Sequence, residues 1–375
     1  MKLVIISHTE HFLKNGEIVG WGPTVREIDY LSSLFDTIIH VAVLHPNIDE
    51  IPNHVRPYTS KTIEFRALLP YGGKRFFDKL SIISTLPTNF SVIHKAVAES
   101  DYFHFRAPTG IGVWVIPYLS FMSSKPGWFK YAGNWMDRGM TVGYRFQKVL
   151  LKFQKKHIVT ANTIKNDSWP QVLAFENPCL TEEDRKDGEE ALKTKTFTKP
   201  YKFCFVGRLE YNKGIDVLME ALKDMNPRLV DCLHIVGEGS LKDELLEISR
   251  SLSFNVYFHN YSPKHDIFKI YSQSNFIILP SISEGFPKVI AEAMNFGCIP
   301  IVSDVSVIRN YISKDIGYLI DSNDRLKSLE SILKHINLLK PYDIVILAES
   351  CLENSKVFTF KRYLERIKNE ILKSE

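Results

Sequence analysis

Two carboxylates, Glu284 and Glu292, stand eight positions apart at a predicted strand–turn–helix junction. The apolar run Phe276–Leu279 precedes Glu284, and Glu292 lies within an amphipathic run from Lys288 to Phe296. A second apolar run, Ile299–Val302, follows. In an open α/β sheet, ligands bind at the carboxyl ends of the strands, where helix N-termini attract anions. Carboxylates before and inside the helix can accept hydrogen bonds from sugar hydroxyls. The alternative is an ordinary capped helix with both acids exposed.

Two cations follow another predicted strand, Lys202–Val206. They are Arg208 and Lys213 in the segment GRLEYNKG. Arg offers a planar fork of donors and Lys a compact charge, which together suit a diphosphate. Because parallel strands end at a common edge, we expect both cations near Glu284. Cations opposite carboxylates predict a ligand with a diphosphate core and hydroxyl-rich ends, such as a nucleotide sugar. Two surface cations beside a turn are the alternative.

Length and composition favour a globular, two-domain protein. The chain has 375 residues, 45% of them hydrophobic and 24% charged, and no apolar run reaches the roughly 18–20 residues that span a bilayer. Five scattered cysteines suit a reducing compartment, and we expect a cytoplasmic protein without a structural metal. The absence of an Asp-x-Asp triplet predicts metal-independent chemistry. A net charge of +4 is too small to indicate nucleic-acid binding.

Strand-like and helix-like runs alternate in both halves, which predicts parallel sheets with crossover helices. We expect an N-terminal domain over residues 1–180, a surface connection over 181–200, a C-terminal domain over 200–357 and a last helix over 358–375. The expected strands are Leu3–Ser7, Thr37–Leu44, Tyr102–Arg106, Trp128–Tyr131, His157–Thr160, Lys202–Val206, Leu233–Val236, Val256–His259, Phe276–Leu279, Ile299–Val302 and Gly317–Ile320.

Polar and glycine residues near strand ends mark a second candidate site in the first half. The first strand leads to His8 and then to a long loop containing Gly22, which permits close backbone approach to a phosphate or sugar. Thr24–Glu27 reads as a capping box, so a helix should begin just after Thr24. A hydroxyl or a lipid-linked phosphate of an acceptor could be oriented by a set of polar side chains, namely His8, His104, Arg106 and Asn134.

The segment 144–157, YRFQKVLLKFQKKH, carries five basic residues and no acidic one. Apolar side chains such as Phe146 and Phe153 interleave with them. A basic amphipathic helix of this kind can lie on an anionic membrane surface. The alternative is a domain helix whose apolar side packs in the core and whose lysines are solvated.

GRLEYNKG, followed by PSISEGFPKVIAEAMNFGCIPIVSD, resembles the retaining GT-B glycosyltransferases of family four. The resemblance is strongest over residues 200–320. It implies an α/β fold of GT-B type, with two Rossmann-like β/α/β domains facing across a cleft. It further implies a retaining, metal-independent hexosyltransferase that takes a UDP- or GDP-sugar as donor and needs no other cofactor. The acceptor would be a glycan or lipid-linked molecule in surface polysaccharide or glycolipid biosynthesis, reached from the inner face of the membrane.

The resemblance also implies roles for individual residues. Arg208 and Lys213 match the pair that holds the donor diphosphate. Glu284 matches the first acid of the E-x7-E motif, near the reacting sugar carbon, and Glu292 matches the second, which binds ribose hydroxyls. Backbone N–H groups of the segment from Gly285 to Lys288, which includes Phe286 and Pro287, would contact the sugar and phosphates.

Some positions depart from the family pattern. Ser306-Val307 stands where members often have a Gly-Gly pair, Asn310 where they have Glu, and Arg106 where a second histidine is expected. Two other functions stay open: a nucleotide-sugar epimerase of the same fold, and a nucleotide-sugar binding protein without turnover. The first would release free nucleotide without an acceptor product. The second is disfavoured because both cations and both acids are present.

Overall fold

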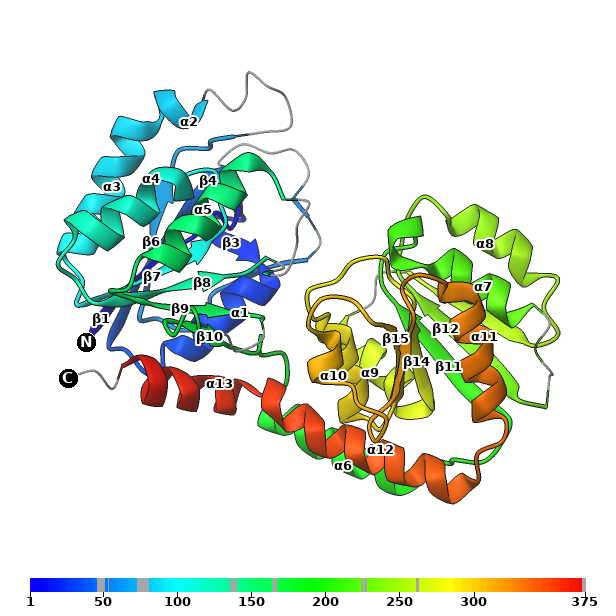
Figure 1. Cartoon of the computed structure of the whole chain (residues 1–375). Helices are drawn as coiled ribbons and strands as arrows, with labels where there is room; N and C mark the ends of the chain where they lie inside the picture. The colour runs from blue at the N-terminus through cyan, green and yellow to red at the C-terminus, as the bar shows by residue number, and fades with distance from the viewer. Residues whose placement is uncertain are drawn as a thin grey trace. The chain divides into compact units, whose positions relative to one another are not determined.

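The chain divides into two compact units, coloured along the sequence in Figure 1. Unit 1 comprises Met1–Glu176 and Tyr363–Glu375, and unit 2 comprises Asn177–Arg362. This computed structural model describes residues 1–45, 51–52, 54–72, 81–133, 135, 140–163, 167–223, 225, 228–260 and 263–372. The chain therefore leaves unit 1 once and returns to it at its C-terminal end.

Unit 1 is built on a sheet whose central strands are all parallel. These run in the spatial order β6-β4-β1-β7-β8-β9-β10, so the sheet grows outward in both directions from β1 and β7. The strand bounds are β1 Lys2–Ile6, β4 Thr37–His45, β6 Ile63–Leu68, β7 Tyr102–Ala107, β8 Gly127–Tyr131, β9 Ile158–Ala161 and β10 Val172–Ala174. All five strands that the sequence predicts in this half are confirmed.

A hairpin occupies the place where the sequence predicts a long loop. β2 (His11–Lys14) pairs antiparallel with β3 (Glu17–Trp21), and β5 (Val55–Pro57) pairs with β3. The helix that follows, α1, runs over Gly22–Leu31 with Trp21 at its N-cap and no capping side chain. The expected capping box is therefore wrong. The reason is that Glu27 turns into the core, where it is 2% exposed.

Helices cover both faces of this sheet and create two apolar cores (Figure 1). One core takes buried side chains from α3, α4 and α5. The other takes them from α1 and from the C-terminal segment after Tyr363. The bounds are α2 Ser81–Ser84, α3 Leu86–Ala98, α4 Gly112–Pro117, the π-helix η2 Tyr118–Met122, α5 Val142–Phe153, α13 Phe360–Arg366 and η6 Ile367–Ile371.

A buried charge cluster joins the C-terminal segment to this sheet. Oε1 of Glu27 accepts hydrogen bonds from Nη1 of Arg106 at 2.7 Å, Nζ of Lys130 at 2.7 Å and the hydroxyl of Tyr363 at 2.9 Å. The three partners come from β7, β8 and α13. A buried carboxylate is stable only when paired and hydrogen-bonded, and two cations satisfy that condition.

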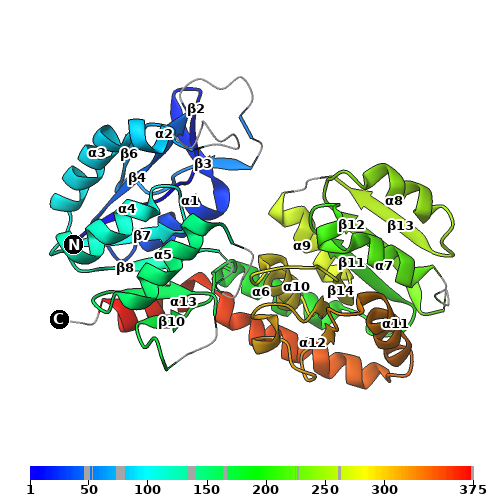
Figure 2. The same ribbon diagram turned by 45° about the horizontal axis from the view of Figure 1, so that its top comes forward.

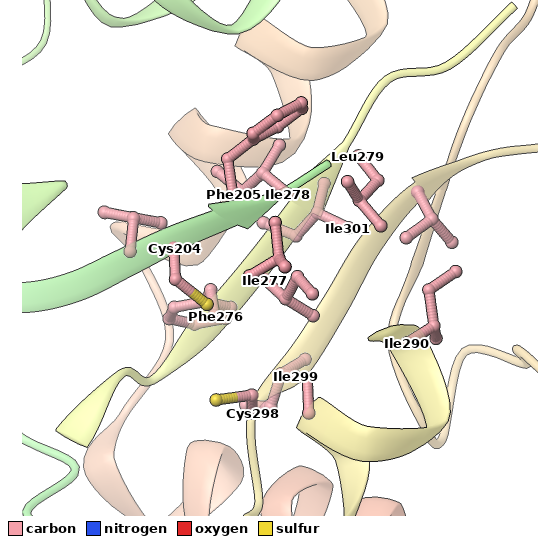
Figure 3. Close-up of a cluster of buried hydrophobic side chains, with 14 of the residues drawn as sticks. Cys204, Phe205, Phe276, Ile277, Ile278, Leu279, Ile290, Cys298, Ile299 and Ile301 are labelled. Atoms are coloured by element: carbon pink, nitrogen blue, oxygen red, sulfur yellow. The ribbon is translucent and has the colours of Figure 1, made fainter. Parts of the chain in front are cut away.

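Unit 2 has an all-parallel sheet in the order β13-β12-β11-β14-β15-β16. Numbered from the first strand of the unit, this is 3-2-1-4-5-6, the doubly wound order of a Rossmann fold. The bounds are β11 Tyr201–Val206, β12 Val230–Val236, β13 Asn255–His259, β14 Phe276–Leu279, β15 Ile299–Ser303 and β16 Tyr318–Ile320. All six strands match the sequence prediction. Figure 3 shows Cys204, Ile277, Ile290 and Ile299 in the core that joins β11, β14 and β15 to α10.

Helices flank the unit 2 sheet on both faces. They are η3 Tyr211–Lys213, α7 Ile215–Leu222, α8 Lys242–Ser249, α9 Lys264–Gln273, α10 Lys288–Asn295, η4 Ile308–Asn310, α11 Arg325–Ile336, α12 Pro341–Ser355 and η5 Lys356–Phe358. Among the described residues, none of the helices in the chain is long and apolar enough to cross a membrane.

The segment expected to be a surface connection is a packed helix of unit 2. α6 spans Glu182–Thr194 and lies beside α12 in both views (Figures 1 and 2). It begins with a capping box formed by Thr181 and Asp184. Nη1 of the buried Arg185 donates hydrogen bonds to Oδ1 of Asn295 at 2.7 Å and to the carbonyl oxygen of Leu352 at 2.8 Å. The sequence indicated a surface connection because the segment is rich in charged residues. Most of these side chains are exposed on the outer side of α6, whereas Arg185 is buried.

Replacement of Glu27 by Gln should destabilise unit 1. Arg106 and Lys130 would stay buried without an anion, which typically costs about 3–5 kcal/mol. All five tryptophans of the chain lie between residues 21 and 169, so tryptophan fluorescence during urea unfolding reports on unit 1. Glu17→Gln, at an exposed position of β3, is the matched control and should change stability by less than about 0.5 kcal/mol. Equal stability of Glu27→Gln and wild type would show that the cluster is not stabilising.

Unit 1 should also lose stability below neutral pH. Burial lowers the pKa of His11 to about 4 and lowers the pKa of His40 and His104 well below 6.5. The unfolded chain therefore binds more protons below about pH 6.5, and each histidine removes about 1.4 kcal/mol per pH unit as the pH falls. The same urea titrations at pH 7 and pH 5 measure this slope. His104→Leu should reduce this dependence of stability on pH by the contribution of one histidine. An unchanged dependence would show that His104 does not contribute to the loss of stability.

Candidate functional site

The doubly wound order of unit 2 places its ligand-binding edge between β11 and β14. These strands are neighbours in the sheet, and the connections that follow them leave in opposite directions. Lys213 lies in η3 after β11, and Glu284 lies in the loop after β14. The two predicted residues are therefore delivered to one edge by strands that are 70 residues apart in sequence but adjacent in space.

Lys213 and Glu284 form an ion pair at this edge. Nζ of Lys213 donates to Oε1 of Glu284, and the two side chains are 21% and 13% exposed. The hydroxyl of Ser281 lies 3.1 Å from the same Oε1 atom and 3.4 Å from the carbonyl oxygen of Lys213. Protein atoms thus fix both charges while leaving part of each accessible.

The backbones of the two loops are clamped together. The N–H of Ile282 donates to the carbonyl of Asn212 at 2.9 Å. Nη1 of Arg325, at the start of α11, donates to the carbonyl of Pro280 at 2.6 Å. Gly214 has φ of +71°, and a Cβ there would lie 2.0 Å from the Pro280 oxygen. Only glycine permits this approach, so the position of Lys213 depends on it.

The segment from Gly285 to Lys288 leads into α10. Pro287 is the N-cap of this helix and supplies no capping side chain. The Phe286 ring turns inward and stacks on Phe358 with centroids 4.6 Å apart. A Cβ on Gly285 would meet no atom within 4 Å. The phenyl ring anchors the loop, while the space beside Gly285 is open to a ligand.

Arg208 and Glu292 occupy the predicted places in the chain, just after β11 and inside α10. Arg208 is 65% exposed at its side chain and pairs with Glu210 at 3.1 Å. Glu292 is half-buried inside α10. Burial, together with the nearby Glu292 carboxylate, raises the pKa of the Cys179 thiol, which places this acid close to Cys179. The structure therefore brings Lys213 and Glu284 together at this edge.

The candidate acceptor residues of unit 1 separate into different environments. His8 is exposed just after β1, and Arg106 lies near the end of the adjacent strand β7. Arg106 is bound to Glu27. His104 is fully buried, 4.3 Å from Trp128 between ring centroids, and neither ring nitrogen has a hydrogen-bond partner among the described residues. Burial thus separates His104 from an accessible ligand site.

Two further acceptor-side predictions concern Gly22 and Asn134. The Gly22 N–H is occupied, because it donates to the carbonyl of His54 at 3.1 Å. Gly22 therefore links the N-terminus of α1 to the backbone at His54, and this N–H is not available to a phosphate. Asn134 lies outside the described residues.

Several residues of these sites were missed by sequence reasoning. Ser281 could have been found, since it stands three positions before Glu284 in a predicted turn. The role of Arg325 could not be predicted from the residues around it, because it contacts Pro280 from a helix 45 residues further along the chain. Lys130 was read as an ordinary strand residue. Its partner Glu27 was assigned to a helix cap, so the pairing could not be inferred from spacing.

The loop after β15 explains one departure from the family pattern. Ser306 has φ of +54°, a left-handed conformation that glycine adopts without strain. This is the position of the first glycine of the Gly-Gly pair in the resembling family. Asp304 and Arg309 bridge the loop, with Nε of Arg309 donating to Oδ1 of Asp304 at 2.9 Å. The loop thus keeps a backbone conformation that glycine favours although the side chain differs.

Across the parts of the chain that the structure describes, no three His, Cys, Asp or Glu side chains gather in a geometry that could hold a metal ion.

Comparison with known proteins finds a family similarity in the second unit. Residues 187–344 match the family Glycosyl transferases group 1. The amylovoran biosynthesis glycosyltransferase AmsD of Erwinia amylovora is 34% identical over 116 residues, which cover 31% of this chain and 33% of that protein. An enzyme of Campylobacter jejuni, N-acetylgalactosamine-N,N'-diacetylbacillosaminyl-diphospho-undecaprenol 4-alpha-N-acetylgalactosaminyltransferase, is 29% identical over 142 residues, or 36% of this chain and 38% of that protein.

These sequence matches span 33% and 38% of the relatives' lengths. The structural likeness covers more. HepE of Anabaena, in complex with UDP, superposes over 100% of both chains with a TM-score of 0.68 at 16% identity. The fold is therefore of GT-B type, with two Rossmann-like units. The sequence similarity to glycosyl transferases group 1 covers residues 187–344, which is less than half of the chain.

The open space beside Gly285 yields a test that separates binding from folding. Gly285→Ala should leave thermal unfolding, followed by circular dichroism, within about 0.5 kcal/mol of wild type, because nothing contacts the added methyl group. If a ligand approaches the backbone here, its affinity should fall at least tenfold. The readout is calorimetric titration of the wild-type and variant proteins with UDP and with GDP.

Gly214→Ala is the matched substitution at a glycine that the fold requires. Its positive φ and the contact with Pro280 predict a loss of about 1–3 kcal/mol of stability. Undiminished affinity in Gly285→Ala would show that no ligand approaches this backbone.

Proposed function

We propose that this protein is a retaining glycosyltransferase that moves a hexose from a UDP- or GDP-sugar to a glycan or lipid-linked acceptor. The observation that carries the proposal is the partly exposed Lys213–Glu284 pair at the switch point of a 3-2-1-4-5-6 sheet. The family match over residues 187–344 supports it. The names of two relatives, one for amylovoran biosynthesis and one for a diphospho-undecaprenol substrate, favour a role in surface polysaccharide or glycolipid biosynthesis.

Lys213 is proposed to hold the donor diphosphate. Breaking the bond between the sugar and the diphosphate places negative charge on the leaving group, and a fixed ammonium group stabilises that charge without reorganisation. The Lys213 ammonium has three donors, so it can keep Glu284 and still reach a phosphate oxygen. Arg208 lies on the same loop with an exposed side chain, and it is proposed to reach the diphosphate from solvent. No metal ion takes part in this scheme.

Glu284 is proposed to lie beside the donor sugar and Glu292 to bind the ribose hydroxyls. Backbone N–H groups between Gly285 and Lys288 would contact the sugar and phosphates. Retention is proposed to follow front-face attack, in which a phosphate oxygen of the leaving group accepts the proton of the acceptor hydroxyl. No protein nucleophile is needed, and none is assigned.

On the acceptor side, His8 is the residue best placed for contact. It is exposed and follows β1 at the switch point of unit 1, between β1 and β7. Arg106 is proposed to act through its charge near that edge while it remains bound to Glu27. His104 is left out because its ring is fully buried.

Donor binding should depend on Lys213. In calorimetric titrations with UDP- and GDP-sugars without added metal, Lys213→Ala and Glu292→Ala should each weaken the bound donor at least tenfold, about 1.4 kcal/mol. Lys223→Ala removes a lysine from the exposed pair with Glu220 in the same unit and serves as the matched control. Wild-type affinity in Lys213→Ala would overturn the assignment of the diphosphate site.

Glu284→Ala should chiefly depress turnover, by about 10²-fold or more, because it removes charge stabilisation next to the reacting carbon. Turnover is followed as nucleoside diphosphate released from the donor in the presence of membrane-extracted acceptor. Nuclear magnetic resonance of the product should show the anomeric configuration of the donor. Wild-type turnover in Glu284→Ala, or nucleotide release without any acceptor product, would contradict the proposed reaction.

A further inference from the structure

Helix α5 turns an apolar face outward. Val142, Phe146, Val149 and Phe153 follow one another at intervals of four, three and four residues, so they form a single stripe along the helix. They are 83%, 48%, 42% and 78% exposed. On the opposite side, Leu151 and Gln147 are buried. A helix of a globular domain normally places its apolar stripe against the core, and α5 exposes a second one to solvent.

The neighbouring element extends this surface. At the end of η2, Phe121 is 69% and Met122 76% exposed. Nζ of Lys156 donates to the carbonyl of Ser123 at 2.7 Å, which ties the segment after α5 to the segment after η2. The end of η2, with Phe121 and Met122, therefore lies near the end of α5, with Phe153. We call these six side chains, Phe121, Met122, Val142, Phe146, Val149 and Phe153, the apolar patch.

Basic residues surround the apolar patch. Residues 141–157, which include α5, contain five Lys and Arg and no acidic residue, in a chain whose formal net charge is only +4. Arg145 and Lys155 are exposed beside the stripe. Lys152 lies over the Trp169 ring, with Nζ 3.7 Å from its centroid. Exposed apolar side chains surrounded by positively charged ones indicate a partner with an apolar interior and a negatively charged surface.

We propose that α5 and the end of η2 form a docking surface for an anionic lipid bilayer. The apolar patch enters the boundary between headgroups and acyl chains, and the surrounding Arg and Lys side chains contact the lipid phosphates. A second copy of this chain is a poorer occupant, because a two-fold contact would set the same basic surface against itself. The surface belongs to unit 1, whereas the proposed donor residues belong to unit 2, so docking does not depend on the proposed sugar transfer.

The sequence leaves open whether the segment 144–157 contacts a membrane or is an ordinary domain helix, and the proposal chooses the first. The sequence places the contact over residues 144–157, and the structure adds Val142 and the end of η2 while it assigns Leu151 to the core. The alternative reading, in which the apolar side of the helix packs inward, accounts for Leu151 but not for Phe146 and Phe153.

The test is co-sedimentation of the full chain with vesicles of phosphatidylcholine alone and with 30% phosphatidylglycerol. We expect binding to the anionic vesicles only, weakened by 0.5 M salt, since surface charge interactions are screened. The double variant Phe146→Ser/Phe153→Ser removes apolar groups, and Arg145→Glu/Lys155→Glu reverses charge. Each should weaken vesicle partitioning at least tenfold.

Matched controls keep the result specific. Leu338→Ser, at a position 80% exposed in unit 2, and Lys61→Glu, at an exposed position of unit 1, should bind vesicles as wild type does. Tryptophan fluorescence verifies that unit 1 of each variant is folded, and donor titration verifies unit 2 independently. Equal partitioning of wild type and both double variants would overturn the proposal. So would a wild-type dimer in light scattering that Phe146→Ser/Phe153→Ser abolishes, since the patch would then be an interface between copies.

Discussion

The candidate site depends on one constraint, the adjacency of β11 and β14 in a doubly wound sheet. This adjacency brings Lys213 and Glu284 within ion-pair distance although 70 residues separate them. The pair alone would be an ordinary partly exposed salt bridge. It becomes a defined site because Gly214 lets the two loops approach to backbone contact and because Arg325 holds the Pro280 carbonyl. The positions of the Lys213 and Glu284 charges thus follow from the order of the strands and from the left-handed backbone conformation of Gly214.

The parallel strands of unit 1 follow the same doubly wound order, but the charged side chains near its switch point are arranged differently. Where unit 2 leaves a lysine and a carboxylate accessible, unit 1 buries Glu27 among Arg106, Lys130 and Tyr363. Because the last of these comes from α13, the cluster ties the C-terminal segment to the sheet of unit 1. The charged groups near this edge therefore contribute to stability, and a ligand at this edge would meet the exposed His8.

The sequence predicted the sheets better than the side-chain environments. Buried parallel strands read as continuous apolar runs, so every strand predicted for unit 2 was found. The β2–β3 hairpin was missed because its glycines and exposed residues look like a loop. Glu27 and Arg106 were misread, since local spacing does not reveal whether a charged side chain is buried with a distant partner. The pairing of Lys213 with Glu284 was predictable because both follow strands whose order the fold class determines.

Hydrogen–deuterium exchange of the full chain, with and without UDP or GDP, tests the central claim most directly. If the switch point of unit 2 holds the donor, protection should appear in residues 207–214 and 281–292, where the clamped loops and the N-terminus of α10 lie. Protection should be lost in Lys213→Ala. Protection confined to other segments, or unchanged exchange in these two at saturating nucleotide, would contradict the assignment of this edge as the donor site.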